Sequence, residues 1–285
     1  MRRDPSGNSG GASRQTSSVV AGLFLLAVAA VTGCTQAARP PAPSAAPAAP
    51  KEIRVGIAPI YPPLAFKEDG QIKGIEVDFS RQLSLDLGVK FVLVELPWDD
   101  LIPALRDGRI DVIMSGMSET PERSQLVSFT DWYVRAGQMA LIRRDDYDKL
   151  RKPGTMNLPT TRVGFQTNST GELYARQDLT KAKLIGYPSF DDGIKALRAK
   201  KIDYFIFDAP AIWRVRGQLR EQYPDLIGRY QPLTDERLAW AVRKDDPALR
   251  DRLNAELGRW KKDGYLESIL DHWIPVRRTT VLMAP

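Results

Sequence analysis

The stretch "PWDDLIPALRDGRIDVIM" at residues 97–114 recurs 92 residues later as "SFDDGIKALRAKKIDYFI" at residues 189–206, and the two copies share eight of eighteen residues without a gap. A shorter pair, "RVGI" from Arg54 and "RVGF" from Arg162, opens an apolar run in each half. Two copies so far apart indicate two similar lobes, because a solenoid needs three or more copies at a short period. The alternative is that helix-to-strand transitions simply look alike.

Apolar runs and helical segments alternate along the chain from residue 51 onward. "KFVLVEL" at residues 90–96 and "IDYFIFD" at residues 202–208 have the length and composition of strands. "GIEVDFSRQLSLDLG" and "PALRDRLNAELGRWKKDG" place leucine or isoleucine on one helical face. This order predicts an α/β fold in which each lobe is a mainly parallel sheet flanked by helices.

The N-terminus carries an export signal. Three arginines precede the thirteen-residue apolar run "VVAGLFLLAVAAV" at residues 19–31, which is too short to span a bilayer comfortably. Residues 1–33 are therefore expected to be a signal peptide. The run "VTGC" resembles the lipobox of bacterial lipoproteins, which implies lipidation of Cys34, and a plain secretory signal is the alternative. Residues 34–50 continue as a proline- and alanine-rich linker.

Composition excludes several functions. Cys34 is the only cysteine and His272 the only histidine, so a Cys/His metal site is excluded from the globular part and no cofactor is expected. Serine-histidine-aspartate catalysis would have to use His272, for which a packed or surface position is the better interpretation. The net charge of +6 falls to +4 without residues 1–33, and acids alternate with bases along the helices, so no nucleic-acid partner is expected.

The repeat also locates a ligand site. In open α/β sheets, ligands bind beyond the carboxyl ends of strands. At the offset of 92, Ser115 and Gly116 correspond to Phe207 and Asp208. We therefore expect "SGMSETPER" from one lobe and "FDAPA" from the other to meet across an interlobe cleft, where one segment brings a cation and the other an anion.

From about Lys51 to Trp273 the chain resembles the family 3 extracellular solute-binding proteins of polar amino-acid ABC importers. The resemblance is carried in order by "IYPPLAFKEDGQIKGIEVDFSRQL", "WDDLIPALRDGRIDVIMSGMSETPER", "VSFTDWY", "VGFQTNSTGELY", "IDYFIFDAPA" and "KDGYLESI". It implies a two-lobed, type II periplasmic-binding-protein-like fold with two hinge strands. Lobe 1 would comprise residues 51–140 plus 238–285, and lobe 2 residues 141–237.

The resemblance also assigns the charged poles of the site. Arg123 is the expected clamp on the ligand α-carboxylate, since a planar guanidinium matches two carboxylate oxygens. Ser118 and the backbone around Gly116 and Met117 would add hydrogen bonds, and Asp208 would accept the α-ammonium. The alternatives are a surface arginine after Pro121 and a turn aspartate before Pro210.

Aromatic and small polar residues complete the expected site. Tyr61 and Trp98 match positions that sandwich the ligand side chain, although both could be ordinary core aromatics. Ser169 and Thr170 match an anion site at a helix N-terminus, and Gln166 stands where some relatives carry lysine. The segment from Ser169 to Glu172 also fits a capping box, and the two roles are compatible.

Together these features predict a protein that is not an enzyme but a binding component. The expected partners are a polar amino acid, an ABC permease with its ATPase, and the membrane through the lipid anchor, with the chain itself a monomer on the extracytoplasmic side. No spare carboxylate is evident in the site motifs, so an uncharged or acidic side chain is expected over a strongly basic one. The alternatives are a ligand sensor for a membrane signalling partner and an enzyme similar to cyclohexadienyl or arogenate dehydratase, with Glu172 or Asp208 as general acid.

Overall fold

The structure is a computed structural model that describes residues 52–216, 221–229 and 232–274. The expected signal peptide, Cys34 and the linker lie outside these residues. Within the described ranges, no helix is long and apolar enough to cross a membrane.

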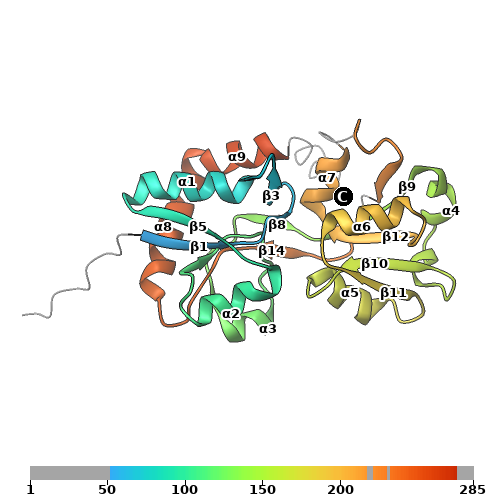
Figure 1. Ribbon diagram of the computed structural model, residues 1–285, viewed down its shortest axis with the longest axis horizontal. Helices are drawn as coiled ribbons and strands as arrows, with labels where there is room; N and C mark the ends of the chain where they lie inside the picture. The colour runs from blue at the N-terminus through green and yellow to red at the C-terminus, as the bar shows by residue number, and fades with distance from the viewer. Residues whose placement is uncertain (1–51, 217–220, 230–231, 275–285) are drawn as a thin grey trace, which may run out of the picture. The chain divides into compact units, whose positions relative to one another are not determined.

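The first sheet has the strand order β5-β1-β6-β15-β7. Its strands are β1 (Glu52–Ile57), β5 (Lys90–Glu95), β6 (Val112–Ile113), β7 (Ser128–Phe129) and β15 (Ala241–Val242). β1 is parallel to both β5 and β6, whereas β15 is antiparallel to β6 and β7. Helices α1 (Ile75–Leu87) and α9 (Tyr265–Trp273) lie on one side of this sheet, and α2 (Leu101–Arg106) and α3 (Pro121–Leu126) on the other, as Figure 1 shows. The long helix α8 (Pro247–Asp263) packs against α1 and α9.

The second sheet repeats this arrangement with the order β11-β10-β12-β9-β13. Its strands are β9 (Gln138–Arg143), β10 (Arg162–Gln166), β11 (Lys183–Tyr187), β12 (Tyr204–Asp208) and β13 (Leu226–Arg229). Its helices are α4 (Tyr147–Leu150), α5 (Thr170–Asp178), α6 (Phe190–Arg198) and α7 (Ala209–Arg216). β10 is parallel to β11 and β12, and β9 is antiparallel to β12 and β13, so each strand has its counterpart in the first sheet. The predicted pair of similar α/β lobes is confirmed.

The two copies of the sequence repeat are held by the same ion pair. Arg54 donates from its backbone N, Nε and Nη2 to Asp111 at 2.8, 2.9 and 2.8 Å, and Arg162 donates in the same way to Asp203 at 2.9, 3.1 and 2.7 Å. Burial opposes ionisation of each aspartate, but the hydrogen bonds from the arginine outweigh it and lower both pKa values. These pairs fasten β1 to β6 and β10 to β12, which explains why "RVG" and "ID" recur together.

Two strands run between the sheets. β8 (Val134–Ala136) follows β7 and leads into β9, while β14 (Glu236–Leu238) leads from the second sheet back to β15, and the two pair with each other antiparallel. They are the two hinge strands of the expected fold (Figure 1). β9 belongs to the second sheet from Gln138 onward, a few residues before the expected lobe boundary at 140, and the division of the chain into lobes stays a prediction.

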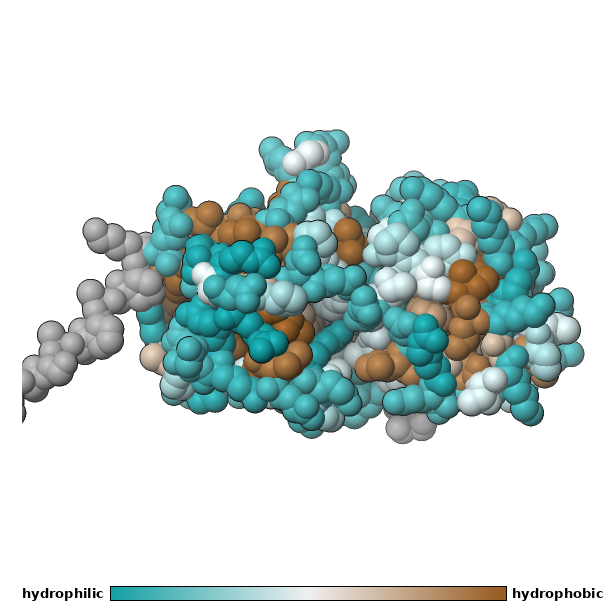
Figure 2. Space-filling model, turned by 60° about the horizontal axis from the view of Figure 1, so that its bottom comes forward, coloured by the Kyte–Doolittle hydropathy of each residue, from teal (hydrophilic) through white to brown (hydrophobic). Residues whose placement is uncertain are grey.

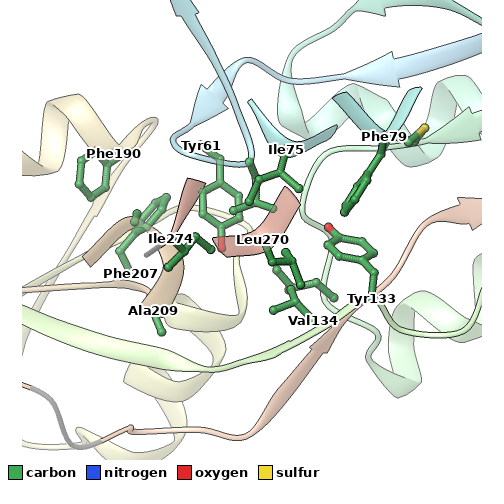
Figure 3. Packing of buried hydrophobic residues seen from close by; sticks show 14 of the residues in the cluster. Tyr61, Ile75, Phe79, Tyr133, Val134, Phe190, Phe207, Ala209, Leu270 and Ile274 are labelled. Atoms are coloured by element: carbon green, nitrogen blue, oxygen red, sulfur yellow. The ribbon is translucent and has the colours of Figure 1, made fainter. Parts of the chain in front are cut away.

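Aromatic side chains fill the core beside these crossing strands. The ring of Phe79 lies 5.5 Å from that of Tyr133, 5.7 Å from that of Trp240 and 5.6 Å from that of Trp260. Figure 3 shows Phe79 and Tyr133 close together, and Tyr61 beside Phe207 of the second sheet. Tyr61 comes from a small sheet of β2 (Ile60–Tyr61), β3 (Ala65–Glu68) and β4 (Gln71–Lys73).

The face of the molecule drawn in Figure 2 is mostly hydrophilic. Figure 2 shows hydrophilic side chains over most of one face, with hydrophobic atoms in separate patches. The exposed large hydrophobic residues are Leu85, Leu126, Trp132, Tyr147, Leu158 and Leu173. Single exposed hydrophobic residues of this kind are common on protein surfaces.

Candidate functional site between the lobes

A small cavity lies where the carboxyl ends of β6, β10 and β12 approach one another. It is lined by Ile60, Tyr61, Trp98, Gly116, Ser118, Arg123, Gln166, Ser169, Thr170 and Asp208. The structure therefore brings nine of the ten predicted site residues together, and their contacts with a ligand stay predictions. The tenth, Met117, lines a neighbouring cavity with Trp98, Arg123 and Asn168, and its carbonyl accepts from the backbone N–H of Ala239 at 3.0 Å.

Arg123 supplies the positive pole. Thr120 caps the short helix α3 with its hydroxyl, which places the guanidinium at the cavity. Nη1 donates to the carbonyl of Ser118 at 3.0 Å and Nη2 to that of Asn168 at 3.3 Å, and the guanidinium lies 5.4 Å from the centre of the Trp98 ring. Burial lowers the pKa of Arg123. Since Arg123 forms no ion pair with any described carboxylate, its charge is left for an anion.

Asp208 supplies the opposite pole at the end of β12. The residue is 9% exposed, and Oδ1 accepts from Nε2 of Gln138 at 2.8 Å. Burial, with a smaller contribution from Glu236, raises the pKa of Asp208 to about 8, although Gln138 and Arg123 act in the other direction. A buried carboxylate in this state binds a cation favourably, because an opposite charge restores its ionised form.

Glu236 is a third charged residue, which lies behind the cavity lining, and the sequence analysis missed it. Its Oε2 accepts from the hydroxyls of Ser118 at 2.5 Å and Thr170 at 2.7 Å, and its Oε1 from that of Thr234 at 2.6 Å. Glu236 lies at the start of β14 and is 118 residues from Ser118 and 66 from Thr170, so no local motif pointed to it.

Gln138 was missed for the same reason. Its Nε2 donates both to Asp208 and to Oγ1 of Thr170, the latter at 2.9 Å, while its Oε1 is buried without a hydrogen-bond partner in the described part of the chain. The hydroxyl of Tyr61 is also buried without a hydrogen-bond partner in the described part of the chain. The Tyr61 ring packs edge-on against Phe207, with 5.2 Å between the ring centres. Unpaired buried polar atoms are rare in folded proteins, and those beside a cavity are available to a ligand.

Asn168 joins the two walls of the cleft directly. Its carbonyl accepts from Trp98 Nε1 at 3.1 Å as well as from Arg123, and its Nδ2 donates to Asp99 at 2.8 Å. Asn168 adopts φ 56°, a left-handed conformation that asparagine tolerates better than most residues. The cleft is therefore closed in this structure.

Ser169 acts as a helix cap. Its hydroxyl accepts from the N–H of Glu172 at 3.2 Å and donates to the carbonyl of Gln166 at 2.7 Å. The Glu172 carboxylate accepts from the N–H of Asn168 at 2.7 Å instead of that of Ser169, and it pairs with Arg176. The capping interpretation is thus observed in a modified form. The carboxylate of Glu172 is occupied by its bonds to Asn168 and Arg176.

His272 does not line the cavity. It lies on α9 with its ring 5.4 Å from that of Trp273. Among the described residues, no group of histidine, cysteine, aspartate or glutamate is arranged to hold a metal ion.

Two matching α/β sheets, two crossing strands and a closed cavity with buried charges of both signs define a two-lobed ligand-binding protein. The chain belongs to the bacterial extracellular solute-binding proteins, family 3, whose family model matches residues 53–276. The family and the type II fold expected from the sequence are confirmed.

Individual relatives agree with this assignment. The chain is 28% identical to ABC transporter arginine-binding protein 1 of Escherichia coli K12 over 233 residues, which are 80% of this chain and 92% of the relative. The putative binding component of an ABC transporter from Wolinella succinogenes, solved with lysine, is 31% identical with a TM-score of 0.74, covering 79% of this chain and 96% of that one. An ancestral amino acid-binding protein, described as a precursor of cyclohexadienyl dehydratase, is 33% identical with a TM-score of 0.73, covering 79% and 96%. These relatives are binding proteins, and the chain is a binding protein and not an enzyme.

The raised pKa of Asp208 has a measurable effect on the ligand-free protein. Because the folded pKa of about 8 exceeds the usual unfolded value of about 3.9, the folded state holds a proton that the unfolded state loses. The stability associated with this proton is complete below pH 4 and is lost as the pH rises toward 8. Asp208→Asn should therefore be more stable than the wild type at pH 8 by at least about 1 kcal/mol, and the difference should shrink at pH 5. Urea unfolding at both pH values measures it, and an equal difference at both would contradict this assignment.

Proposed function

We propose that this protein is the extracytoplasmic substrate-binding component of an ABC importer and that it binds a polar amino acid in the interlobe cleft. The observation that carries this proposal is the pair Arg123 and Asp208, which are buried at one cavity without forming an ion pair with each other. An amino-acid zwitterion presents one carboxylate and one ammonium, and it satisfies both poles at once.

The positive side of the cavity has backbone donors beside Arg123. The N–H groups of Ser118 and Thr170 have no hydrogen-bond acceptor within the described residues. Thr170 begins α5, where the helix dipole also favours an anion. These donors support placement of the α-carboxylate beside Arg123, with the α-ammonium toward Asp208.

The side-chain preference needs revision in the light of Glu236. The expectation of an uncharged or acidic side chain rested on the lack of a further carboxylate, and Glu236 now provides one within hydrogen-bond reach of two cavity residues. With Asp208 ionised, two carboxylates and one guanidinium lie at or behind the cavity lining, and a ligand of net charge +1 balances them. Relatives named for arginine and solved with lysine support a basic side chain, for which Tyr61 and Trp98 offer aromatic faces.

A thermal-shift screen of the twenty amino acids tests this specificity. Arginine, lysine or histidine should give the largest rise in melting temperature, because a net positive ligand offsets the charge of the cleft. A largest shift with aspartate or glutamate would show that the assignment of charges is wrong.

Replacement of Arg123 tests the carboxylate clamp. Arg123→Ala should weaken binding of the best amino acid by at least about 100-fold, because the ligand carboxylate would be buried without its charged partner. Arg123→Lys should also bind poorly, since an ammonium keeps the charge but lacks the planar fork. Arg109→Ala is a matched control, because Arg109 is an exposed arginine of the same lobe, 3.9 Å from Asp107. Wild-type affinity of folded Arg123→Ala in titration calorimetry would disprove the clamp.

Closure of the lobes provides the signal for transport. The hydrogen bonds of Asn168 to Trp98, Arg123 and Asp99 exist only when the walls of the cleft meet. Movement about β8 and β14 would break them and open the site. A permease that distinguishes the closed form from the open form can then respond to ligand binding, with its ATPase driving uptake.

We also propose that lipidation of Cys34 anchors the protein as a monomer to the bacterial membrane. The proline-rich segment between Cys34 and the folded part separates anchor from cleft. Cys34→Ser should therefore move the protein from the membrane fraction to the soluble extracytoplasmic fraction without a change in ligand affinity. Fractionation followed by immunoblotting measures this, and unchanged membrane retention would contradict lipidation.

A further inference from the structure

The carboxylate of Glu236 accepts hydrogen bonds from three hydroxyl groups. Ser118 donates to Oε2 at 2.5 Å, Thr170 to the same oxygen at 2.7 Å, and Thr234 to Oε1 at 2.6 Å. Ser118 and Thr170 line the cavity, whereas Glu236 does not, so the carboxylate acts on the cavity through these two hydroxyls.

The direction of these hydrogen bonds decides what the hydroxyls offer to a ligand. An ionised carboxylate only accepts, and a hydroxyl has a single proton to donate. Ser118 Oγ therefore presents lone pairs to the cavity. Thr170 Oγ1 already accepts from Gln138 Nε2 at 2.9 Å, so it has one further lone pair. While both hydroxyls donate their protons in hydrogen bonds to Glu236, neither hydroxyl can donate to a ligand carboxylate.

The charge around Glu236 favours the same polarity. Glu236 forms no ion pair with any described arginine, lysine or histidine, so its direct hydrogen-bond partners are the three hydroxyls, and Arg123 acts on it only from a longer distance. Asp208 lines the same cavity, and Gln138 links it to Thr170. Once a ligand ammonium restores the ionised form of Asp208, the hydroxyls and Asp208 form one continuous group of acceptors.

We propose that Glu236 is a positioning residue that fixes the hydroxyls of Ser118 and Thr170 as acceptors, so that they receive protons of the ligand ammonium and the site rejects carboxylic acids that lack an amine. The proposal rests on the proposed function, that the cavity binds an amino acid. The carboxylate is left to Arg123 and the backbone N–H groups.

The same contact links this selectivity to closure. Ser118 follows β6 of the first lobe, Thr170 begins α5 of the second, and Glu236 lies on the crossing strand β14. The two hydroxyls converge on one carboxylate oxygen only when the lobes are together. The pair of acceptor hydroxyls therefore forms when the lobes close, and a ligand ammonium can bind to both hydroxyls only in the closed form.

The experiment compares two probes that differ only in the amine, L-arginine and 5-guanidinopentanoic acid, by titration calorimetry. The wild type should prefer arginine strongly. In Glu236→Gln the new amide donates to one hydroxyl and frees its proton for the cleft, so the preference should fall by at least about tenfold. If Glu236 had only a structural role, its replacement would weaken the binding of both probes equally, and the ratio of their two dissociation constants would not change. Ser118→Ala should also lower the ratio, with little further loss when combined with Glu236→Gln.

Asp235→Asn is the matched control, because Asp235 is the adjacent carboxylate and forms an exposed pair with Arg135 at 2.6 Å. It should keep the wild-type ratio. A wild-type ratio in both folded Glu236→Gln and Ser118→Ala overturns the proposal and leaves the proposed function intact. A wild type that binds none of the twenty amino acids overturns both. If it binds another amino acid, the ratio is measured with that amino acid and its deaminated analogue.

Discussion

The rest of the site depends on one constraint, which is that a basic and an acidic side chain, Arg123 and Asp208, are buried at one cavity without forming an ion pair. Arg123 is held by the carbonyls of Ser118 and Asn168, and Asp208 by the amide of Gln138. These neutral groups position each side chain, but neither side chain has an oppositely charged partner at ion-pair distance among the described residues. In the empty closed cleft Asp208 avoids the cost of a buried charge by holding a proton, in line with its raised pKa, and a nearby cation favours its ionised form.

A second buried carboxylate, that of Glu76, holds the loop that carries Gly116 at the cavity. Glu76 of α1 accepts from the N–H of Gly116 at 2.7 Å, the hydroxyl of Tyr133 at 2.5 Å and Nε1 of Trp240 at 2.9 Å. Tyr133 precedes β8 and Trp240 follows β14, so Glu76 ties the cleft loop to both crossing strands. Burial raises the pKa of Glu76 to about 7, although the three donors oppose this rise. Gly116 adopts φ 68°, and a Cβ there would lie 2.6 Å from the Tyr61 ring.

The two lobes use one structural plan for different purposes. Equivalent arginine-aspartate pairs, Arg54 with Asp111 and Arg162 with Asp203, secure the middle strands of the two sheets. At the carboxyl ends of those strands the equivalence stops, because the first lobe places Arg123 at the cavity and the second places Asp208. The shared interior provides rigid walls, and the differing loops provide opposite charges for one ligand.

The sequence by itself indicated the α/β class and the two similar lobes, because helical periodicity, apolar runs and the internal repeat are visible along the chain, and its resemblance to the family supplied nine of the residues that line the cavity. It did not reveal Glu236 or Gln138. Glu236 gave no local signal in "LTDERLAW", and it reaches Ser118 and Thr170 only because the chain crosses between the lobes at β14. The polarity of the site was thus decided by tertiary structure, since a hydroxyl donates or accepts according to which partner the fold places beside it.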